Sequence, residues 1–329
     1  MSCLLYNFAI EPLGEMIRKT RLKGIKIENN GQILVHMFTD NTLVYLDKQD
    51  KMERLNKVLK TFCRASTAKV NIEKTEYLPV GENDFRKKVI EERIWGKNQI
   101  EIGPRIIKDS KSMRTLGSWV GNEKNDRIQW EKIMENQQKV INMWSKMNLS
   151  YRGKELVLKA LIQFKATYLM TVNGLPKDIK DKMKRMYKEF IWDNKKALMS
   201  WEQIIAPRDK GRLRVPDIKS RLEVIEIMWI KKWLALTEKR PKWATILNKI
   251  IMEKIPKSPM IDRKSRISWI LQSWHEFESK EIKLSHEIRY MLKIARKYNI
   301  TAIARKYSKE TKRQLPLWHN TMMTNANYQ

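Results

Sequence analysis

ILVHMFTDNTLVYL, residues 33–46, is the stretch on which the fold assignment depends. Its β-branched and aromatic residues favour strands over a helix, and two apolar runs flank a polar tip at residues 39–41. Asp and Asn tolerate turn conformations, so this tip is the natural bend of a hairpin. A single carboxylate, Asp40, lies at the bend. On pattern alone, an ordinary buried hairpin with a polar turn accounts for the stretch.

The segments around this hairpin predict a mixed α/β half of the chain. Residues 2–19 predict a helix that Pro12 should kink, and Asn29-Asn30-Gly31 predicts a turn between two strands. Residues 47–66 predict an amphipathic helix. A short strand at residues 74–81 and a strand pair at residues 112–122 complete this half.

Strand signals largely end near residue 123, and helical periodicity replaces them. One predicted helix has Ser150 as its cap and is marked by apolar residues at helical spacing: Leu156, Val157, Ala160, Leu161, Phe164, Tyr168, Leu169 and Val172. Asp217 is expected to cap a later helix. Short breaks between the helices are typical of a compact bundle.

The composition points to a polyanionic partner. The 329 residues include 67 Lys+Arg and 37 Asp+Glu, which give a net charge of +30 and a pI near 10.0. Nucleic acid fits best, because phosphates attract Lys and Arg without special geometry. No apolar run of about 18 residues would span a membrane, and the N-terminus lacks the basic region of a signal peptide. Two cysteines cannot form a disulfide framework, so we expect an intracellular protein.

A mixed α/β half with an Asp-tipped hairpin, followed by a helical bundle, is the layout of a polymerase palm and thumb. The residues resemble the reverse transcriptase of non-LTR (LINE-type) retrotransposons, particularly fungal ones, over about residues 2–240. The similar segments, in chain order, are SCLLYNFAIEPL, VHMFTDNTLVYL, ASTAKVNIEKTEYLPVG, MRTLGSWVGN and FIWDNKKALMSWEQIIAPRDKGRLRVPDIKSR. The resemblance implies an α+β fold, with a truncated palm in residues 1–122, an all-helical thumb in 123–196 and a basic helical extension in 197–329.

The resemblance also implies roles for particular residues. Asp40 and Asn41 match the first and second catalytic aspartates of the Phe-Ala-Asp-Asp hairpin, and Asp40 would bind magnesium. Asn71 would lie near the incoming nucleotide, and Lys74 would assist the departure of pyrophosphate. The segment MRTLGSWVGN matches the strand pair that forms the primer grip in this family, and Leu116 and Gly117 would lie at the primer 3′ end.

The catalytic set is incomplete. In this family two aspartates of the hairpin and one from an earlier strand together hold two divalent cations. Asn41 is isosteric with Asp but neutral, and the earlier strand would precede Met1. Asp47 and Asp50 lie roughly 20 Å or more from the tip, at about 3.3 Å per strand residue. We therefore expect an incomplete magnesium site at Asp40 and no DNA synthesis by this chain.

Nucleic-acid binding depends on many cations and is expected to persist. The candidate contacts are Lys146, Arg152, Lys154, Arg208, Lys210, Arg212 and Arg214. For any one of these residues, a solvated surface charge is the simpler explanation. Only the excess of Lys and Arg over the whole chain supports nucleic-acid binding by the group. The expected partner is an RNA–DNA duplex. Three interpretations remain open: a truncated, degenerate reverse transcriptase, a non-catalytic basic nucleic-acid-binding protein derived from one, or a product that folds poorly and has no function.

Overall fold

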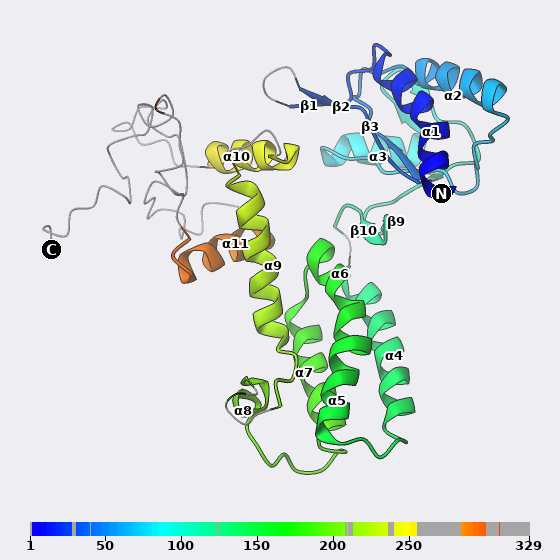
Figure 1. Ribbon diagram of the computed structural model, residues 1–329. Helices are drawn as coiled ribbons and strands as arrows, with labels where there is room; N and C mark the ends of the chain where they lie inside the picture. The colour runs from blue at the N-terminus through cyan, green and yellow to red at the C-terminus, as the bar shows by residue number, and fades with distance from the viewer. Residues whose placement is uncertain are drawn as a thin grey trace, which may run out of the picture. The chain divides into compact units, whose positions relative to one another are not determined.

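The computed structural model describes residues 2–27, 31–39, 41–123, 125–207, 213–235, 240–254 and 284–300, together with Asp209 and Lys309. Two compact units divide the chain, residues 1–216 and 217–329. The first unit contains a mixed α/β segment followed by a helical bundle, and the second is helical in its described part (Figure 1). Within the residues that the structure describes, the expectation of an α+β chain whose strands end near residue 123 is confirmed.

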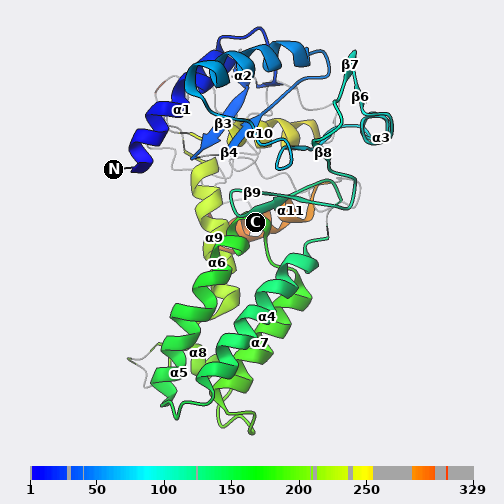
Figure 2. The same ribbon diagram turned by 90° about the vertical axis from the view of Figure 1, so that its right-hand side faces the viewer.

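The α/β segment begins with helix α1 (Ser2–Arg18), which contains Pro12, and continues into short antiparallel hairpins. Strand β1 (Ile25–Lys26) pairs with β2 (Gln32–Ile33), and β3 (Val35–Phe38) pairs with β4 (Asn41–Val44). Helix α2 (Met52–Ser66) follows and packs against α1. Figure 2 shows α1 and α2 beside the β3–β4 hairpin.

The rest of this segment alternates one helix with very short strands. Strand β5 (Glu76–Tyr77) pairs in parallel with β8 (Arg105–Ile106), and between them lie α3 (Asn83–Glu92) and the hairpin β6 (Ile94–Trp95)–β7 (Asn98–Gln99). Strand β9 (Met113–Thr115) and β10 (Ser118–Val120) form the last hairpin. Each of the five sheets in the described residues has two strands, so this segment is held by its shared core rather than by a broad sheet.

That core forms where the amphipathic pattern of residues 47–66 predicts it. Leu55 and Phe62 of α2 are buried together with Leu13 and Ile17 of α1, and Leu34 lies with them just before β3. Burying a large aliphatic or aromatic side chain contributes about 1.5–3 kcal/mol, so these few contacts fix the position of the hairpin. The first turns of α1, with Leu4 and Phe8, remain exposed.

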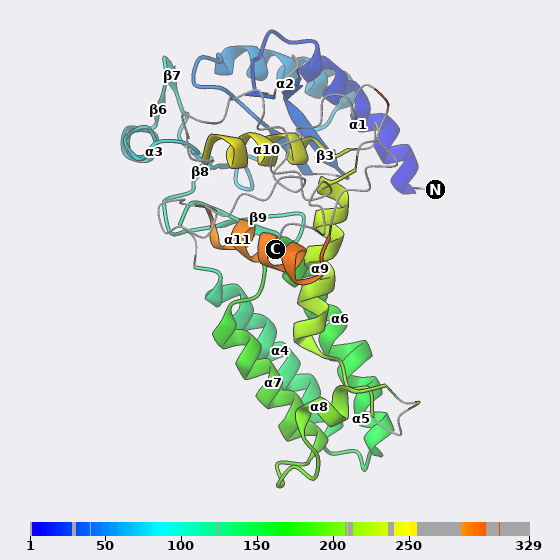
Figure 3. The same ribbon diagram turned by 90° about the vertical axis from the view of Figure 1, so that its left-hand side faces the viewer.

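The helical bundle contains α4 (Arg127–Trp144), α5 (Tyr151–Val157), α6 (Phe164–Asn173), α7 (Lys177–Ile191) and the short α8 (Trp201–Ile205). Between α5 and α6 the chain forms a π-helical turn, η1 (Leu158–Gln163), so the three run as one rod. Ser150 caps α5 as expected, because its side chain accepts a hydrogen bond from the Gly153 N–H. Helices α4 and α7 lie side by side in Figures 2 and 3.

The second unit consists, in its described part, of α9 (Ile218–Trp233), α10 (Lys242–Lys254) and α11 (His286–Lys297). Asp217 caps α9 as predicted, and its carboxylate accepts from the Ser220 N–H at 2.9 Å. Helices α9 and α11 pack around a core that includes Ile230, Trp233 and Leu292. Among the described helices, none is both long enough and apolar enough to cross a bilayer.

Candidate nucleic-acid interface

The tip of the β3–β4 hairpin is shorter than the sequence indicates. Phe38 pairs with Asn41, so Asn41 is the first residue of β4 and the turn consists of positions 39 and 40. Thr39 has a φ of +49°, the left-handed conformation that such tight turns require. Asn41 is exposed, and Asp40 itself lies outside the described residues. Asn41 thus lies in the first pair of the β3–β4 ladder, and its match to a catalytic aspartate stays a prediction.

The acidic residues after β4 serve the fold. Asp50 is only 2% exposed, and its carboxylate accepts from the backbone N–H groups of Lys23, Gly24 and Asp47 at 2.6, 3.0 and 2.8 Å. These bonds join the loop after α1 to the loop before α2. Nowhere in the described part do three or more His, Cys, Asp or Glu side chains form a cluster that could hold a metal ion. The magnesium expected at Asp40 stays a prediction.

Asn71 and Lys74 lie together in an exposed turn before β5. The Asn71 side-chain oxygen accepts from the Lys74 N–H at 3.1 Å, and its backbone carbonyl accepts from the Thr75 hydroxyl at 2.8 Å. An asparagine that bonds its own chain in this way shapes a turn. Asn71 therefore has a local role in shaping the turn that contains Lys74. Contact of either residue with a nucleotide stays a prediction.

Leu116 and Gly117 form the turn of the β9–β10 hairpin, within the strand pair predicted at residues 112–122. Ser118 pairs with Thr115, so the turn contains only these two residues, with φ values of +50° and +76°. Glycine adopts such a φ freely, whereas leucine rarely does. Leu116 is exposed, and its carbonyl accepts a hydrogen bond from the hydroxyl of Tyr168 on α6. The turn is thus held against the helical bundle.

The predicted basic contacts divide into three groups. Lys146, Arg152 and Arg214 are exposed and free to meet a phosphate. Arg208, Lys210 and Arg212 lie outside the described residues. Lys154 differs from the expectation, because its side chain turns inward.

Lys154 is 4% exposed, and its ammonium donates to the Ile191 carbonyl at 3.1 Å and to the Asp193 carboxylate at 2.6 Å. A cation near the last carbonyls of α7 also interacts favourably with the helix dipole. Lys154 therefore ties α5 to the end of α7, and it is removed from the candidate interface.

The π-turn η1 changes which apolar residues of the α5–α6 rod face the core. A π-turn contains one more residue than an α-turn and leaves backbone carbonyls accessible to side chains. Here Gln137 of α4, 1% exposed, donates to the Ile162 carbonyl at 2.9 Å. The buried apolar residues of the rod are Val157, Leu158, Ile162, Ala166, Leu169 and Met170.

Most of the apolar residues that mark this rod in the sequence are exposed instead. They form, with the cations between them, one set that we call the outer face: Arg152, Leu156, Lys159, Phe164, Lys165, Tyr168 and Val172. Phe164 is 76% exposed. Lys159 and Lys165 were not among the contacts predicted from the sequence. These two cations lie between exposed apolar side chains, and this pattern distinguishes the outer face. The pattern can be recognised only once the π-turn is known.

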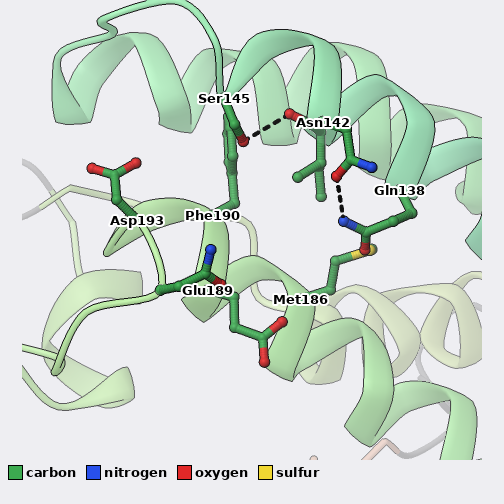
Figure 4. A pocket seen from close by; sticks show the side chains of 9 residues that line it. Gln138, Asn142, Ser145, Met186, Glu189, Phe190 and Asp193 are labelled. Carbon is green, nitrogen blue, oxygen red and sulfur yellow. Dashed lines mark hydrogen bonds between the residues drawn. The ribbon is translucent and has the colours of Figure 1, made fainter.

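A separate cavity of about 350 Å³ opens between α4 and α7 (Figure 4). Its lining is polar and partly acidic, with Gln138 and Asn142 on one side and Glu189 and Asp193 on the other. Gln138 donates to the Asn142 side-chain oxygen at 2.8 Å, and Asp193 is the partner of Lys154. Carboxylates repel phosphate, so this cavity does not extend the basic surface.

The chain has relatives among known proteins. It is similar to an uncharacterized 149 kDa protein of transposon TX1 from Xenopus laevis, 23% identical over 254 residues, which are 75% of this chain and 18% of that protein. It is also similar to a putative ribonuclease H protein of Arabidopsis thaliana, 26% identical over 124 residues, 36% of this chain and 19% of that protein. The chain thus spans less than a fifth of the length of either relative. No model of a known protein family matches it.

Proposed function

We propose that this chain is a degenerate reverse transcriptase of a LINE-type retrotransposon, corresponding to part of the palm and the thumb, which binds nucleic acid without synthesising DNA. Similarity to a transposon protein along 75% of the chain supports the ancestry. The order of the elements, hairpins first and a helical bundle after them, agrees with the order of the motifs. The observation that carries the binding activity is the outer face, where cations alternate with exposed apolar side chains.

The lack of synthesis follows from charge at the β3–β4 tip. Two divalent cations about 3.5–4 Å apart need several anionic oxygens around them. The tip offers the carboxylate of Asp40 and the neutral amide of Asn41. The next acidic residue with a buried carboxylate, Asp50, is occupied by three backbone N–H groups. These residues do not fit a pair of magnesium ions.

Primer extension on an RNA template, with Mg²⁺ or Mn²⁺, tests this half of the proposal. The chain should extend no primer, and Asp40→Ala should leave that result unchanged. Asn41→Asp is the informative variant, because it restores the second carboxylate without changing side-chain size. Extension by the parent chain that disappears in Asp40→Ala would overturn the proposed inactivity.

Binding through the outer face suits a sugar–phosphate strand. Lys159, Lys165 and Arg152 are exposed cations that can neutralise phosphates, while Phe164 and Leu156 offer apolar surface to the sugars. Contacts of this kind read the backbone and carry no sequence information. We therefore propose an RNA–DNA duplex as the partner, bound without sequence preference.

The salt dependence of binding tests this second half. The logarithm of the association constant should fall linearly with the logarithm of the salt concentration, and each phosphate contact contributes a slope of about −0.9. Lys159→Ala combined with Lys165→Ala should reduce the slope by about 2 units. The matched control, Lys182→Ala with Arg185→Ala, removes two exposed charges from α7 and should change the slope little. Equal effects of both pairs would contradict binding through the outer face.

The alternative is a nucleic-acid-binding protein that derives from such an enzyme and has no remaining preference for a primed duplex. Arg214, exposed just before α9, and the basic segment around it favour this possibility, because they lie outside the motifs of synthesis. A competition assay distinguishes the two. A preference for duplex with a recessed 3′ end supports the reverse-transcriptase remnant, and equal affinity for blunt duplex supports the alternative.

A further inference from the structure

Two side chains of α6 join the β9–β10 hairpin to the helical bundle. Asn173 accepts from the Trp119 N–H at 3.2 Å and from the Ser118 hydroxyl at 3.1 Å, and its amide nitrogen donates to the Trp119 carbonyl at 2.7 Å. Tyr168 donates its hydroxyl to the carbonyl of Leu116. The hairpin is therefore held at its turn and along one strand, beside the end of α6 (Figure 1).

The register of the hairpin explains why Asn173 meets Trp119. Ser118 and Thr115 pair next to the turn, and Trp119 and Arg114 form the following pair. Hydrogen-bonded and non-bonded pairs alternate in an antiparallel ladder, so the N–H and C=O of Trp119 point outward from the open edge of β10. A primary amide carries a donor and an acceptor side by side, as a neighbouring strand would. Asn173 thus takes the place of a third strand.

Tyr168 approaches the turn closely, and both this contact and the φ of +76° favour glycine at position 117. A Cβ atom on Gly117 would lie 3.1 Å from the Cε1 atom of the Tyr168 ring. The same ring is 49% exposed and belongs to the outer face. One residue therefore contacts the turn and also forms part of the proposed binding surface. A ligand that covers Tyr168 lies beside Leu116 as well.

We propose that Tyr168 and Asn173 are positioning residues, which fix the turn at residues 116–117 relative to the outer face so that both contact a bound nucleic acid in one register. This inference rests on the nucleic-acid binding proposed above. A hairpin with strands of three residues is marginally stable by itself in water. Without the two attachments it would be ordered only when the ligand binds, and that ordering would weaken the affinity.

Hydrogen exchange in the free protein tests the attachment separately from binding. The Trp119 amide should exchange slowly in the parent chain. In Asn173→Ala it should exchange about tenfold faster, the factor expected when one ordinary hydrogen bond is lost. Asn142→Ala, on α4, is the matched control and should leave this amide unchanged. Equal protection of Trp119 in the parent and Asn173→Ala would overturn the attachment.

Site-specific crosslinking tests the positioning. In a chain with Cys3→Ser and Cys63→Ser, Leu116→Cys carries a photoreactive maleimide, and the probe is a DNA primer annealed to a longer RNA. The parent should crosslink mainly to one primer nucleotide. Asn173→Ala and Tyr168→Phe should spread the crosslinks over several nucleotides, while the control Tyr151→Phe keeps the single position. Tyr168→Phe removes one oxygen atom and therefore remains informative if Asn173→Ala fails to fold.

The outcomes separate this inference from the proposed function. Binding by all variants with crosslinks at the same single nucleotide would overturn the positioning role and leave the proposed function intact. A parent chain that binds neither duplex nor single strand would overturn the proposed function, and the positioning role with it. Scattered crosslinks in the two variants, with unchanged melting temperature, would support both.

Discussion

At the scale of single residues, buried polar side chains determine how the loops of the α/β segment are held. Asp50 is the clearest case, because three backbone N–H groups from two loops converge on its carboxylate. Its position in the sequence, well after the hairpin tip, suggests an acidic residue too far away to take part in the magnesium site. The structure assigns it to the connection between α1 and α2.

We predict that Asp50→Ala destabilises the α/β segment by roughly 2–4 kcal/mol, since buried N–H groups lose a charged acceptor. Urea unfolding measures the change. The control is Asp47→Ala, whose carboxylate accepts only from the Gln49 N–H near the surface and which should cost less than about 1 kcal/mol. An equal loss in both variants would contradict the role of Asp50.

A second residue-scale prediction concerns Glu226 on α9. Burial, with the nearby Glu287, raises the pKa of Glu226 to about 7. A raised pKa in the folded state means that stability is greatest below the ordinary value of 4.5 and falls as the pH rises through 7. Glu226→Gln should therefore slow hydrogen exchange in α9 and α11 at pH 8 and have little effect at pH 5.

Glu223, one turn earlier on α9, behaves in the opposite way. Burial acts to raise its pKa, but hydrogen bonds from Lys297 and Tyr298 outweigh burial and lower it. Its contribution to stability is present above pH 4.5 and is lost at more acidic pH, outside the window of the Glu226 experiment. Glu287→Gln is the matched control and should shift the Glu226 transition to lower pH. A Glu226→Gln effect of equal size at pH 5 and pH 8 would contradict the assignment.

Residues whose function depends only on local sequence could be predicted. Ser150 and Asp217 cap helices as expected, and the turn at Leu116 and Gly117 lies where the glycine indicates. Lys154 could not be placed, because its burial depends on Asp193, which approaches only after α5 and α7 pack. The Tyr168 and Asn173 contacts cross more than 50 positions of sequence, and no local pattern contains them.

At the scale of elements, the π-turn between α5 and α6 has the largest effect on the predictions. Helical periodicity predicts one helix that is capped by Ser150 and marked by apolar residues from Leu156 to Val172, and the rod, Tyr151 to Asn173, contains all of these residues. The phase of that helix cannot be read from the sequence, because two apolar stripes compete for the core. Gln137 supports the observed phase, because it donates a hydrogen bond to the Ile162 carbonyl inside the bundle.

Gln137→Leu should consequently destabilise the bundle by about 1–3 kcal/mol, because a buried carbonyl loses its partner. Its neighbour Gln138 is exposed and bonds only Asn142 among the contacts described above, so Gln138→Leu is the control and should stay within about 0.5 kcal/mol. Thermal unfolding of both variants gives the comparison. Neutral behaviour of Gln137→Leu would show that the π-turn persists without this bond.

At the scale of the whole molecule, the sequence predicts the class of fold, and the domain boundaries expected after residues 122 and 196 stay predictions. The first compact unit extends to residue 216. Trp201 and Ile204 of α8 are buried, and Val215 donates its N–H to the Ile204 carbonyl at 2.9 Å. Lys184 of α7 lies 5.2 Å above the Trp201 ring. These contacts attach α8 and Val215 to the bundle, and a shift in composition does not reveal them.

The net charge of +30 gives a prediction for the free protein. Self-repulsion destabilises a compact chain with this charge, and salt screens it over a Debye length of about 10 Å at 0.1 M. Between 20 and 200 mM NaCl the screening length falls to roughly one-third of its starting value. The melting temperature should therefore rise over this range, while the affinity for nucleic acid falls. A neutral osmolyte at equal osmolality is the control. A melting temperature independent of salt would contradict net repulsion.

The π-turn also bears on how sequences of related proteins are aligned. Insertions are usually assigned to loops, yet a π-turn holds its additional residue within a continuous helix. Removing one residue from the segment Leu158–Gln163 would rotate everything beyond it by about 100°. An alignment that allows gaps only between helices would pair Tyr168 and Asn173 with residues on another side of the rod. The correct gap position lies inside the helix, and a relative with one residue fewer there should bind its hairpin through different side chains.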